Sequence, residues 1–220
     1  MEYKNQIENI AEYVNIKDFT NTLKSLYAKV KSDSTFNTFG KTQFVCWSLE
    51  DNITGQRSNY ANIYEPILSE HRKVHPDLGG RSTGFNTSDS VDKDCYAHTD
   101  VDYWTEHPNN YNLVIPVEGS SRIDFFETRP EEIQLPERNA HGEWYYHEFK
   151  MRGKQGYEKF QEQRKYGHII VDRPLLINTN IMHRVVVTEA PRCAWVTRWI
   201  NIPMEINFQD FKIHVESKLC

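Results

Sequence analysis

The 220-residue sequence has no long apolar run, no paired cysteines and no excess of positive charge. No segment approaches the roughly 18 consecutive apolar residues that predict a membrane span. The first residues, MEYKNQIENIAEY, are charged from the second position and lack the apolar segment of a signal peptide. The four cysteines are scattered without a CxxC pair, which argues against a disulfide framework or a zinc knuckle. We therefore expect a cytoplasmic protein with no membrane segment.

The charge balance gives no general attraction to polyanions. The formal net charge is -5 and the sequence pI is about 6.0, so nucleic acid and anionic membranes are not expected partners. The Gly-rich stretch GGRSTGFNTS lacks the GK[ST] signature and the following helix of a phosphate-binding loop. A small-molecule substrate is the remaining expectation, and the composition indicates no particular oligomeric state.

Aromatic residues, in contrast, are plentiful: 12 Tyr, 11 Phe and 5 Trp, or 13% of the chain. At this length, such a content is typical of one globular domain with its own core. We divide the single predicted domain into N-terminal helices with a supporting strand (1–79), a β core (80–202) with an insertion at about 129–166, and a C-terminal tail (203–220).

The first 79 residues carry mainly helical patterns. Residues 3 to about 31 predict two helices, of which the second is capped by Asp18. The stretch KTQFVCWSL (41–49) is typical of a strand, and YANIYEPILSEHRKV (60–74) predicts a short helix that ends before Pro76.

From residue 80 onward the pattern changes to short runs rich in Val, Ile, Thr and aromatics. These predicted strands are GFNTS (84–88), DCYAHTD (94–100), YNLVIPVEG (111–119), RIDFFET (122–128), GHIIVD (167–172), PLLINT (174–179), HRVVVTE (183–189) and RCAWVTRWI (192–200). Runs of this length and spacing indicate a β-sandwich or barrel rather than βαβ units.

The insertion at about 129–166 is long and charged, and it contains a predicted helix at KQGYEKFQEQRKYG. Such an excursion forms a lid in some β proteins and a plain surface element in others. Its segment 150–165 has six Lys or Arg against two Glu, which favours a solvated surface over a contact for an anionic substrate. His141 and His147, in the same insertion, are interpreted as surface histidines.

Two His-x-Asp motifs compete as the start of a metal site. His98-Thr99-Asp100 lies on a predicted strand, where residues two apart point to the same face. His75-Pro76-Asp77 follows a predicted helix and precedes a Gly-Gly turn, so we prefer the first motif. His183, at the head of a later strand, completes a set of two histidines and one carboxylate, which can hold Fe(II) and leave three coordination positions open.

The ordered set His98, Asp100, His183 and Arg192 resembles the Fe(II)/2-oxoglutarate-dependent oxygenases. Arg192 follows His183 by nine positions, which is similar to the prolyl-hydroxylase-like branch, with TEAP as a hairpin turn between them. The resemblance covers residues 80–202. It implies a mainly β fold, a double-stranded β-helix (cupin-like jelly roll) with flanking N-terminal helices.

The resemblance also implies roles for two further side chains. Arg192 is the preferred anchor for the far carboxylate of 2-oxoglutarate, because its planar fork holds a carboxylate with two parallel hydrogen bonds. Arg198, on the same face of the strand, is the rival anchor. From the residues themselves, Tyr96, two positions before His98, is expected by strand alternation to point into the same cavity, and Asn112 to have a comparable position on the next strand. Each binds 2-oxoglutarate or substrate there, or else is a buried residue with an ordinary hydrogen bond.

The implied activity is hydroxylation of a substrate C–H bond with Fe(II), 2-oxoglutarate and O2, releasing succinate and CO2. Asp100 favours hydroxylation, since halogenating relatives replace this carboxylate with a small residue, while desaturation and demethylation stay open as alternatives. Our first expectation for the substrate is a small polar metabolite such as an amino acid, ahead of a protein side chain and of nucleic acid. Two alternatives stay open: a cupin-type metalloenzyme that does not use 2-oxoglutarate, and a non-catalytic jelly-roll binding module.

Overall fold

A computed structural model describes residues 9–30, 45–51, 56–57, 60–74, 80–91, 96–100, 109–134 and 147–220. The helices are α2 (Thr20–Val30), α3 (Ala61–Arg72), α4 (Tyr157–Arg164) and α5 (Phe208–Leu219), with a 3-10 turn, η2, at Pro130–Glu132. The strands are β1 (Ala11–Tyr13), β2 (Val45–Asp51), β3 (Gln56–Arg57), β4 (Gly80–Ser88), β5 (Asn109–Phe126), β6 (Ile133–Gln134), β7 (Glu148–Phe149), β8 (Lys165–Ile170), β9 (Leu175–Asn178) and β10 (His183–Ile202). Among the described residues, no helix combines the length and the apolar character needed to cross a membrane.

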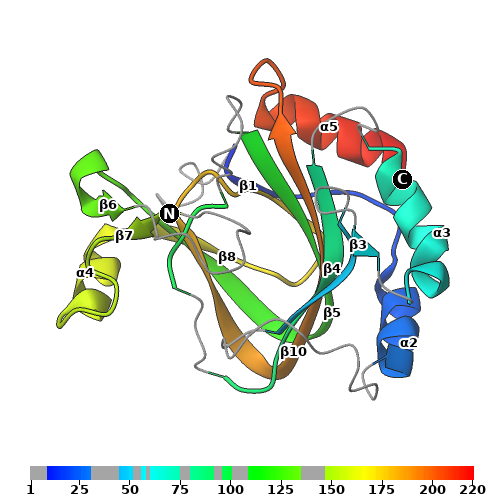
Figure 1. Ribbon diagram of the computed structural model, residues 1–220, viewed down its shortest axis with the longest axis horizontal. Coiled ribbons are helices and arrows are strands. Elements are labelled where there is room, and N and C mark those ends of the chain that lie inside the picture. Colours follow the sequence, from blue (N-terminus) through cyan, green and yellow to red (C-terminus); the bar gives the residue numbers. More distant parts are fainter. Residues whose placement is uncertain are drawn as a thin grey trace.

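One antiparallel sheet of eight strands dominates the molecule. Its order is β1-β9-β5-β10-β4-β2-β3, and β8 also pairs with β5. The first half of β5 pairs with β9 and its second half with β8, while β10 follows β5 along both halves. The sheet therefore curls (Figure 1), and the predicted mainly β, jelly-roll fold class is confirmed.

The two long strands bend together, at a place where the sequence predicts turns. The pairing of β10 with β5 shifts register between Val187 and Ala194, as β-bulges do. Opposite these shifts, Gly119 has φ +64°, and a Cβ at this position would collide with carbonyl oxygens of Glu189 and Pro191. The predicted hairpin at TEAP and the predicted break after residue 119 are therefore wrong: each is a bend within one continuous strand.

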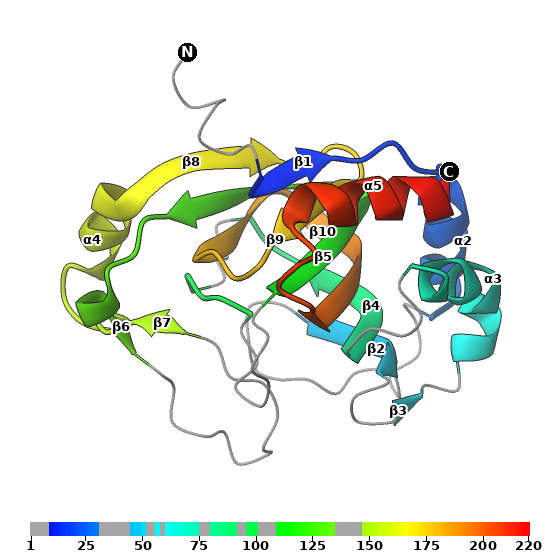
Figure 2. The ribbon, with the colours of Figure 1, turned by 90° about the horizontal axis from the view of Figure 1, so that it is seen from above.

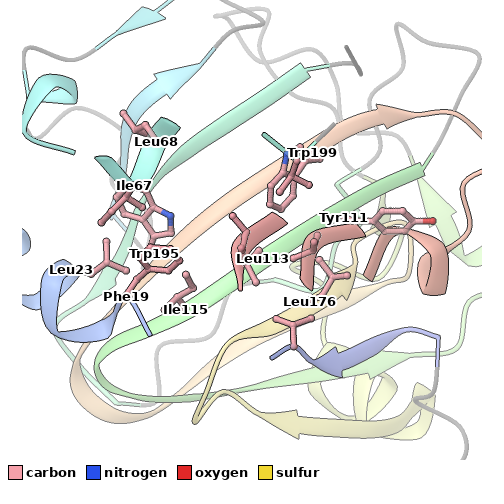
Figure 3. Packing of buried hydrophobic residues seen from close by; sticks show 14 of the residues in the cluster. Phe19, Leu23, Ile67, Leu68, Tyr111, Leu113, Ile115, Leu176, Trp195 and Trp199 are labelled. Carbon is pink, nitrogen blue, oxygen red and sulfur yellow. The ribbon is translucent and has the colours of Figure 1, made fainter. Parts of the chain in front are cut away.

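Alternate residues of β5 and β10 face two different hydrophobic clusters. Tyr111, Leu113, Ile115, Trp195 and Trp199 pack with helix residues such as Leu23, Ile67 and Phe211 in the larger cluster, part of which Figure 3 shows. Val114 and Ala194 belong to the second cluster, on the opposite face of these strands. By the same alternation, Asn112 and Arg198 lie on this second face.

The two ends of the chain differ from the sequence prediction. The segment Ala11–Tyr13, which was predicted to lie in a first helix, forms strand β1 and pairs with Leu175–Ile177. The edge of the sheet supplies hydrogen-bond partners for its backbone, and this pairing overrides the helical periodicity of the sequence. Residues 203–220, predicted as a tail, contain α5, whose buried residues are Phe208, Phe211, Val215 and Leu219. Because each such side chain stabilises the fold by about 1.5–3 kcal/mol, α5 is part of the core. The predictions for α2, with its Asp18 cap (2.8 Å from Oδ1 to the amide of Thr20), and for α3 are confirmed.

The insertion forms a separate small unit at one end of the molecule. It consists of η2, the two-stranded sheet β6-β7 and α4, which confirms the predicted helix. Figures 1 and 2 place this unit at the end of the sheet opposite to α2, α3 and α5. Its position leaves it next to the N-terminal end of β10.

Candidate metal centre

His98 and His183 are brought side by side by a reciprocal backbone pair. The amide of His98 donates to the carbonyl of His183, and the amide of His183 donates to the carbonyl of His98, both at 2.9 Å. Their imidazole rings lie 4.8 Å apart between centroids. Residues 96–100 form no continuous strand, contrary to the prediction, because only His98 makes ladder pairs, to His183 on one side and to Glu148 on the other.

A hydrogen bond to a backbone carbonyl two residues earlier fixes the tautomer of each imidazole. Nδ1 of His98 donates to the carbonyl of Tyr96 at 2.7 Å, and Nδ1 of His183 donates to the carbonyl of Ile181 at 2.8 Å. A carbonyl oxygen only accepts hydrogen bonds, so Nδ1 carries the proton in each ring. Nε2 is then the nitrogen whose lone pair can bind a metal ion. Burial, with a smaller contribution from the neighbouring imidazole of His98, lowers the pKa of His183 to about 4, so this ring is neutral at pH 7.

Asp100 is held through its backbone and one carboxylate oxygen. Its amide donates to the carbonyl of Thr179 at 2.8 Å, and its carbonyl accepts from the side-chain amide of Asn110. Oδ2 accepts from Nδ2 of Asn112 at 2.9 Å and lies 3.9 Å from Nη2 of Arg198. Burial opposes ionisation, but the positive charge of Arg198 and the neighbouring His98 outweigh it and hold the pKa of Asp100 far below its usual range.

The other carboxylate oxygen has no hydrogen-bond donor within the described part of the chain. Oδ1 of Asp100 is fully buried, accepts no hydrogen bond there and lies 3.3 Å from Nε2 of His98. Burying a carboxylate oxygen without a hydrogen-bond donor costs free energy, unless a bound ligand such as a metal ion takes the place of the donor.

Together the three residues satisfy the requirements of a metal site. Their donor atoms all lie within 4.8 Å of one another. The 3.3 Å between Nε2 of His98 and Oδ1 of Asp100 is close to the roughly 3 Å expected for adjacent ligands at metal–ligand distances of about 2.1 Å. Two imidazoles and one carboxylate, on one side of an ion, suit a divalent first-row metal such as Fe(II).

The two candidate arginines occupy different surroundings. Arg192 is buried, and its Nη1 donates to the carbonyl of Asn86 at 3.0 Å and to the side-chain oxygen of the same residue. Arg198 lies beside the carboxylate of Asp100, and its side chain is 28% exposed. Their roles in cosubstrate binding remain predictions.

The remaining candidates are placed as follows. Asn112 reaches the site but donates to Asp100, and its Oδ1 is buried with no hydrogen-bond donor in the described ranges. Tyr96 lies outside any strand, so the strand alternation that predicted its direction into the cavity does not apply. The residue is 46% exposed, and the guanidinium of Arg152 lies over its ring. Roles of both in cosubstrate binding remain predictions. The motif at 75–77, and His141, fall outside the described residues.

Sequence reasoning missed several residues that support the site. Asn110 shares a strand face with Asn112, so alternation along NNYNL was a signal that could have identified it. Glu148 and His147 pair with His98 and Thr99 from the insertion. No pattern in the sequence links these two segments, because their contact is purely tertiary.

No family model and no curated protein sequence matches this chain. Among solved structures, the chain is similar to a Pseudomonas putida prolyl-4-hydroxylase, with 9% identity over 90% of this chain and 96% of that chain and a TM-score of 0.45. It is also similar to the Geodermatophilus obscurus L-ribose isomerase, at 11% identity over 83% and 81% of the two chains and a TM-score of 0.41. A third likeness, at 10% identity and a TM-score of 0.30, is to Peruvianin-I, a cysteine peptidase from Thevetia peruviana latex; it covers 56% of this chain and 52% of that one. With TM-scores below 0.5, these likenesses carry no conclusion about chemistry, and the assignment of the metal centre rests on its own geometry.

Proposed function

We propose that this protein is an Fe(II)- and 2-oxoglutarate-dependent dioxygenase that hydroxylates a C–H bond of a small polar metabolite such as an amino acid. One observation carries the proposal: one possible ligand atom from each of His98, Asp100 and His183 lies within 4.8 Å of the others, while backbone carbonyls hold both Nδ1 atoms and Asn112 holds Oδ2. Such a set leaves about three positions of a six-coordinate ion open for cosubstrate and oxygen.

Each protein group has a defined task in this proposal. His98, Asp100 and His183 would hold Fe(II), which supplies the oxidative decarboxylation of 2-oxoglutarate by O2 coupled to substrate hydroxylation. Asn112 keeps Oδ2 of Asp100 engaged, so that Oδ1 is the oxygen presented to the metal. The carbonyls of Tyr96 and Ile181 keep both imidazoles in the tautomer that can bind.

We assign the far carboxylate of 2-oxoglutarate to Arg192 rather than to Arg198. Arg198 already lies within 3.9 Å of Asp100, where its charge offsets that of the metal ligand. Arg192 is buried further along the same strand face, where its Nη1 donates to the neutral Asn86 rather than to a carboxylate, and its guanidinium fork suits the carboxylate of a cosubstrate.

A turnover assay tests this function. Protein loaded anaerobically with Fe(II) is exposed to air and carboxyl-labelled 2-oxoglutarate, with a panel of amino acids and small polar metabolites. We expect succinate and CO2 in a 1:1 ratio from the parent. Arg173→Gln, a matched arginine change at the exposed surface, should give as much product as the parent, and His183→Ala should give none. Arg192→Ala should raise the KM for 2-oxoglutarate by about tenfold to a hundredfold, the value of hydrogen bonds to a charged group.

The two alternatives predict different results. A cupin-type metalloenzyme without 2-oxoglutarate would bind the metal, form no succinate and retain its activity in Arg192→Ala. A binding module would take up no stoichiometric Fe(II). Either result would contradict the proposed function.

A further inference from the structure

The residues directly before both metal-binding histidines pack against the insertion. Ala97 and Met182 are buried in a small hydrophobic cluster with Phe126 and Phe149, and Tyr157 and Phe160 of α4 pack against it. Ala97 precedes His98, and Met182 precedes His183. One apolar cluster therefore supports both ligand-bearing segments from the side of the insertion.

The insertion also supplies the second edge of the segment 96–100. On one side, His98 pairs with His183; on the other, it pairs with Glu148 of β7. The amide of Thr99 donates to the carbonyl of His147 at 3.1 Å, and the amide of His147 donates to Oγ1 of Thr99 at 3.2 Å. Apart from the insertion, the described backbone partner of His98 is His183.

A charged pair on the insertion reaches the hydrogen bond that orients His98. Glu148 is 4% exposed and forms an ion pair with Arg152, four residues later. The guanidinium of Arg152 lies 4.0 Å from the centre of the Tyr96 ring, a distance typical of a cation–π contact. Tyr96, in turn, provides the carbonyl that accepts from Nδ1 of His98.

A second connection leads from α4 to the other histidine. Nε2 of Gln161 donates to the hydroxyl of Tyr157 at 2.9 Å, and Oε1 of Gln161 accepts from Nη1 of Arg184 at 2.9 Å. Arg184 directly follows His183. The insertion thus contacts both histidine segments through polar side chains as well as through the apolar cluster.

We propose that the unit formed by β7 and α4 is a positioning element of the metal centre rather than a lid, and that Arg152 sets metal affinity through Tyr96 and His98. The inference rests on the proposed metal centre but not on the use of 2-oxoglutarate. Groups that orient a metal ligand without touching the metal typically change affinity by 10–100-fold when they are removed.

Metal binding by the full chain, measured without turnover, tests this role. Mn(II) is titrated into the metal-free protein and followed by electron paramagnetic resonance, and the ligand-field absorption of Co(II) reports the geometry of the site. Arg152→Gln should weaken Mn(II) binding about tenfold and change the Co(II) spectrum. Arg152→Lys keeps the positive charge near Tyr96 and Glu148, so its Mn(II) affinity should lie between those of Arg152→Gln and the parent.

Arg173→Gln is the matched control, because Arg173 also pairs with a carboxylate (Asp172) and lies over a tyrosine ring (Tyr13), but is outside the insertion. It should bind Mn(II) as the parent does. Equal affinities of Arg152→Gln and the parent would overturn the inference. An equal loss in Arg152→Gln and Arg173→Gln would overturn it too, because the loss would then not depend on the contacts of Arg152. If Arg152→Gln fails to fold, Tyr96→Leu replaces it, because this change keeps the orienting carbonyl but removes the ring. Mn(II) binding weakened by about threefold would support the inference, and unchanged Mn(II) binding would overturn it.

The outcomes separate this inference from the proposed function. A parent that binds Mn(II) but never converts 2-oxoglutarate would contradict the function and leave the positioning role intact. A parent that converts 2-oxoglutarate, with unchanged Mn(II) affinity in Arg152→Gln and Tyr96→Leu, would contradict the positioning role alone. A parent that binds no Mn(II) would overturn both.

Discussion

Asp100 and Asp124 are both buried and both have a lowered pKa, but only one of them is open to a ligand. Asp124, on β5, is fully buried; its Oδ1 contacts Arg122 and Lys165 at 2.9 Å, and its Oδ2 contacts Arg184 at 3.0 Å. Asp100 has a single amide donor on Oδ2, and Oδ1 faces two imidazoles. Burial and a shifted pKa therefore do not distinguish a functional carboxylate from a structural one, whereas an oxygen without a donor does.

The largest effect on stability is expected at Asp124. Asp124→Asn leaves three cationic side chains around a neutral group. We expect the free energy of unfolding to fall by about 3 kcal/mol, the lower end for breaking a buried ion pair, because Arg122 and Lys165 reach solvent. Urea unfolding measures this loss, and the folded protein should still bind one Mn(II) per chain. An unchanged midpoint of urea unfolding would mean that the ion pairs of Asp124 add no stability.

The opposite pattern is expected at Asp100. Asp100→Asn replaces a charged metal ligand with a poor one, so Mn(II) affinity should fall about 100-fold or more, beyond the range for indirect contacts. The free energy of unfolding of the metal-free protein should fall by less than in Asp124→Asn, since Arg198 lies 3.9 Å away and is partly exposed, and the amide is cheaper to bury. Isothermal titration and urea unfolding together measure both quantities. Retained affinity would exclude Asp100 as a ligand.

The pH dependence of stability sharpens the comparison further. Burial raises the pKa of Asp124, but hydrogen bonds and charges from Lys165, Arg122 and Arg184 outweigh this effect and lower it below its ordinary value. A carboxyl with a lowered pKa in the folded state adds stability above its unfolded pKa of about 3.9, and this stability is lost as the pH falls through the folded value.

The difference in unfolding free energy between the parent and Asp124→Asn should therefore stay constant from pH 7 to about pH 5 and shrink below about pH 4. Chemical unfolding at a series of pH values gives this difference directly. A difference that grows on acidification would contradict the assigned sign.

The smallest effect is expected for the arginine beside Asp100. Arg198 lies 3.9 Å from the carboxylate and is partly exposed, so Arg198→Ala should cost less than about 1 kcal/mol of stability. Arg184→Ala, at the tighter and more buried contact with Asp124, should cost more. Thermal unfolding of the two variants, side by side, checks the order. The reverse order would remove the distinction between the two aspartates.

The sequence was sufficient for the fold class and for the histidines and aspartate of the site. The spacing of His98 and Asp100, and the position of His183 before an apolar run, predicted a shared ion, and their donor atoms do lie together. The prediction of a strand around His98 was wrong, because His98 makes single backbone pairs with His183 and Glu148 rather than an extended ladder. Contacts between segments so distant in the chain leave no local pattern.

Other differences have separate physical causes. Gly119 and Pro191 are ordinary turn residues, but here they lie opposite each other where two paired strands bend together. The helical signal of α5 was present in the spacing of Phe208, Phe211, Val215 and Leu219. Beta strand β1 carried a misleading helical periodicity, and its conformation follows from pairing with β9.

An anomalous-difference map of crystals soaked with Mn(II) tests the central claim most directly. We predict one strong peak per chain, within about 2.3 Å of Nε2 of His98, Nε2 of His183 and Oδ1 of Asp100. A map with no peak between these three side chains, at full occupancy of the soak, would contradict the account.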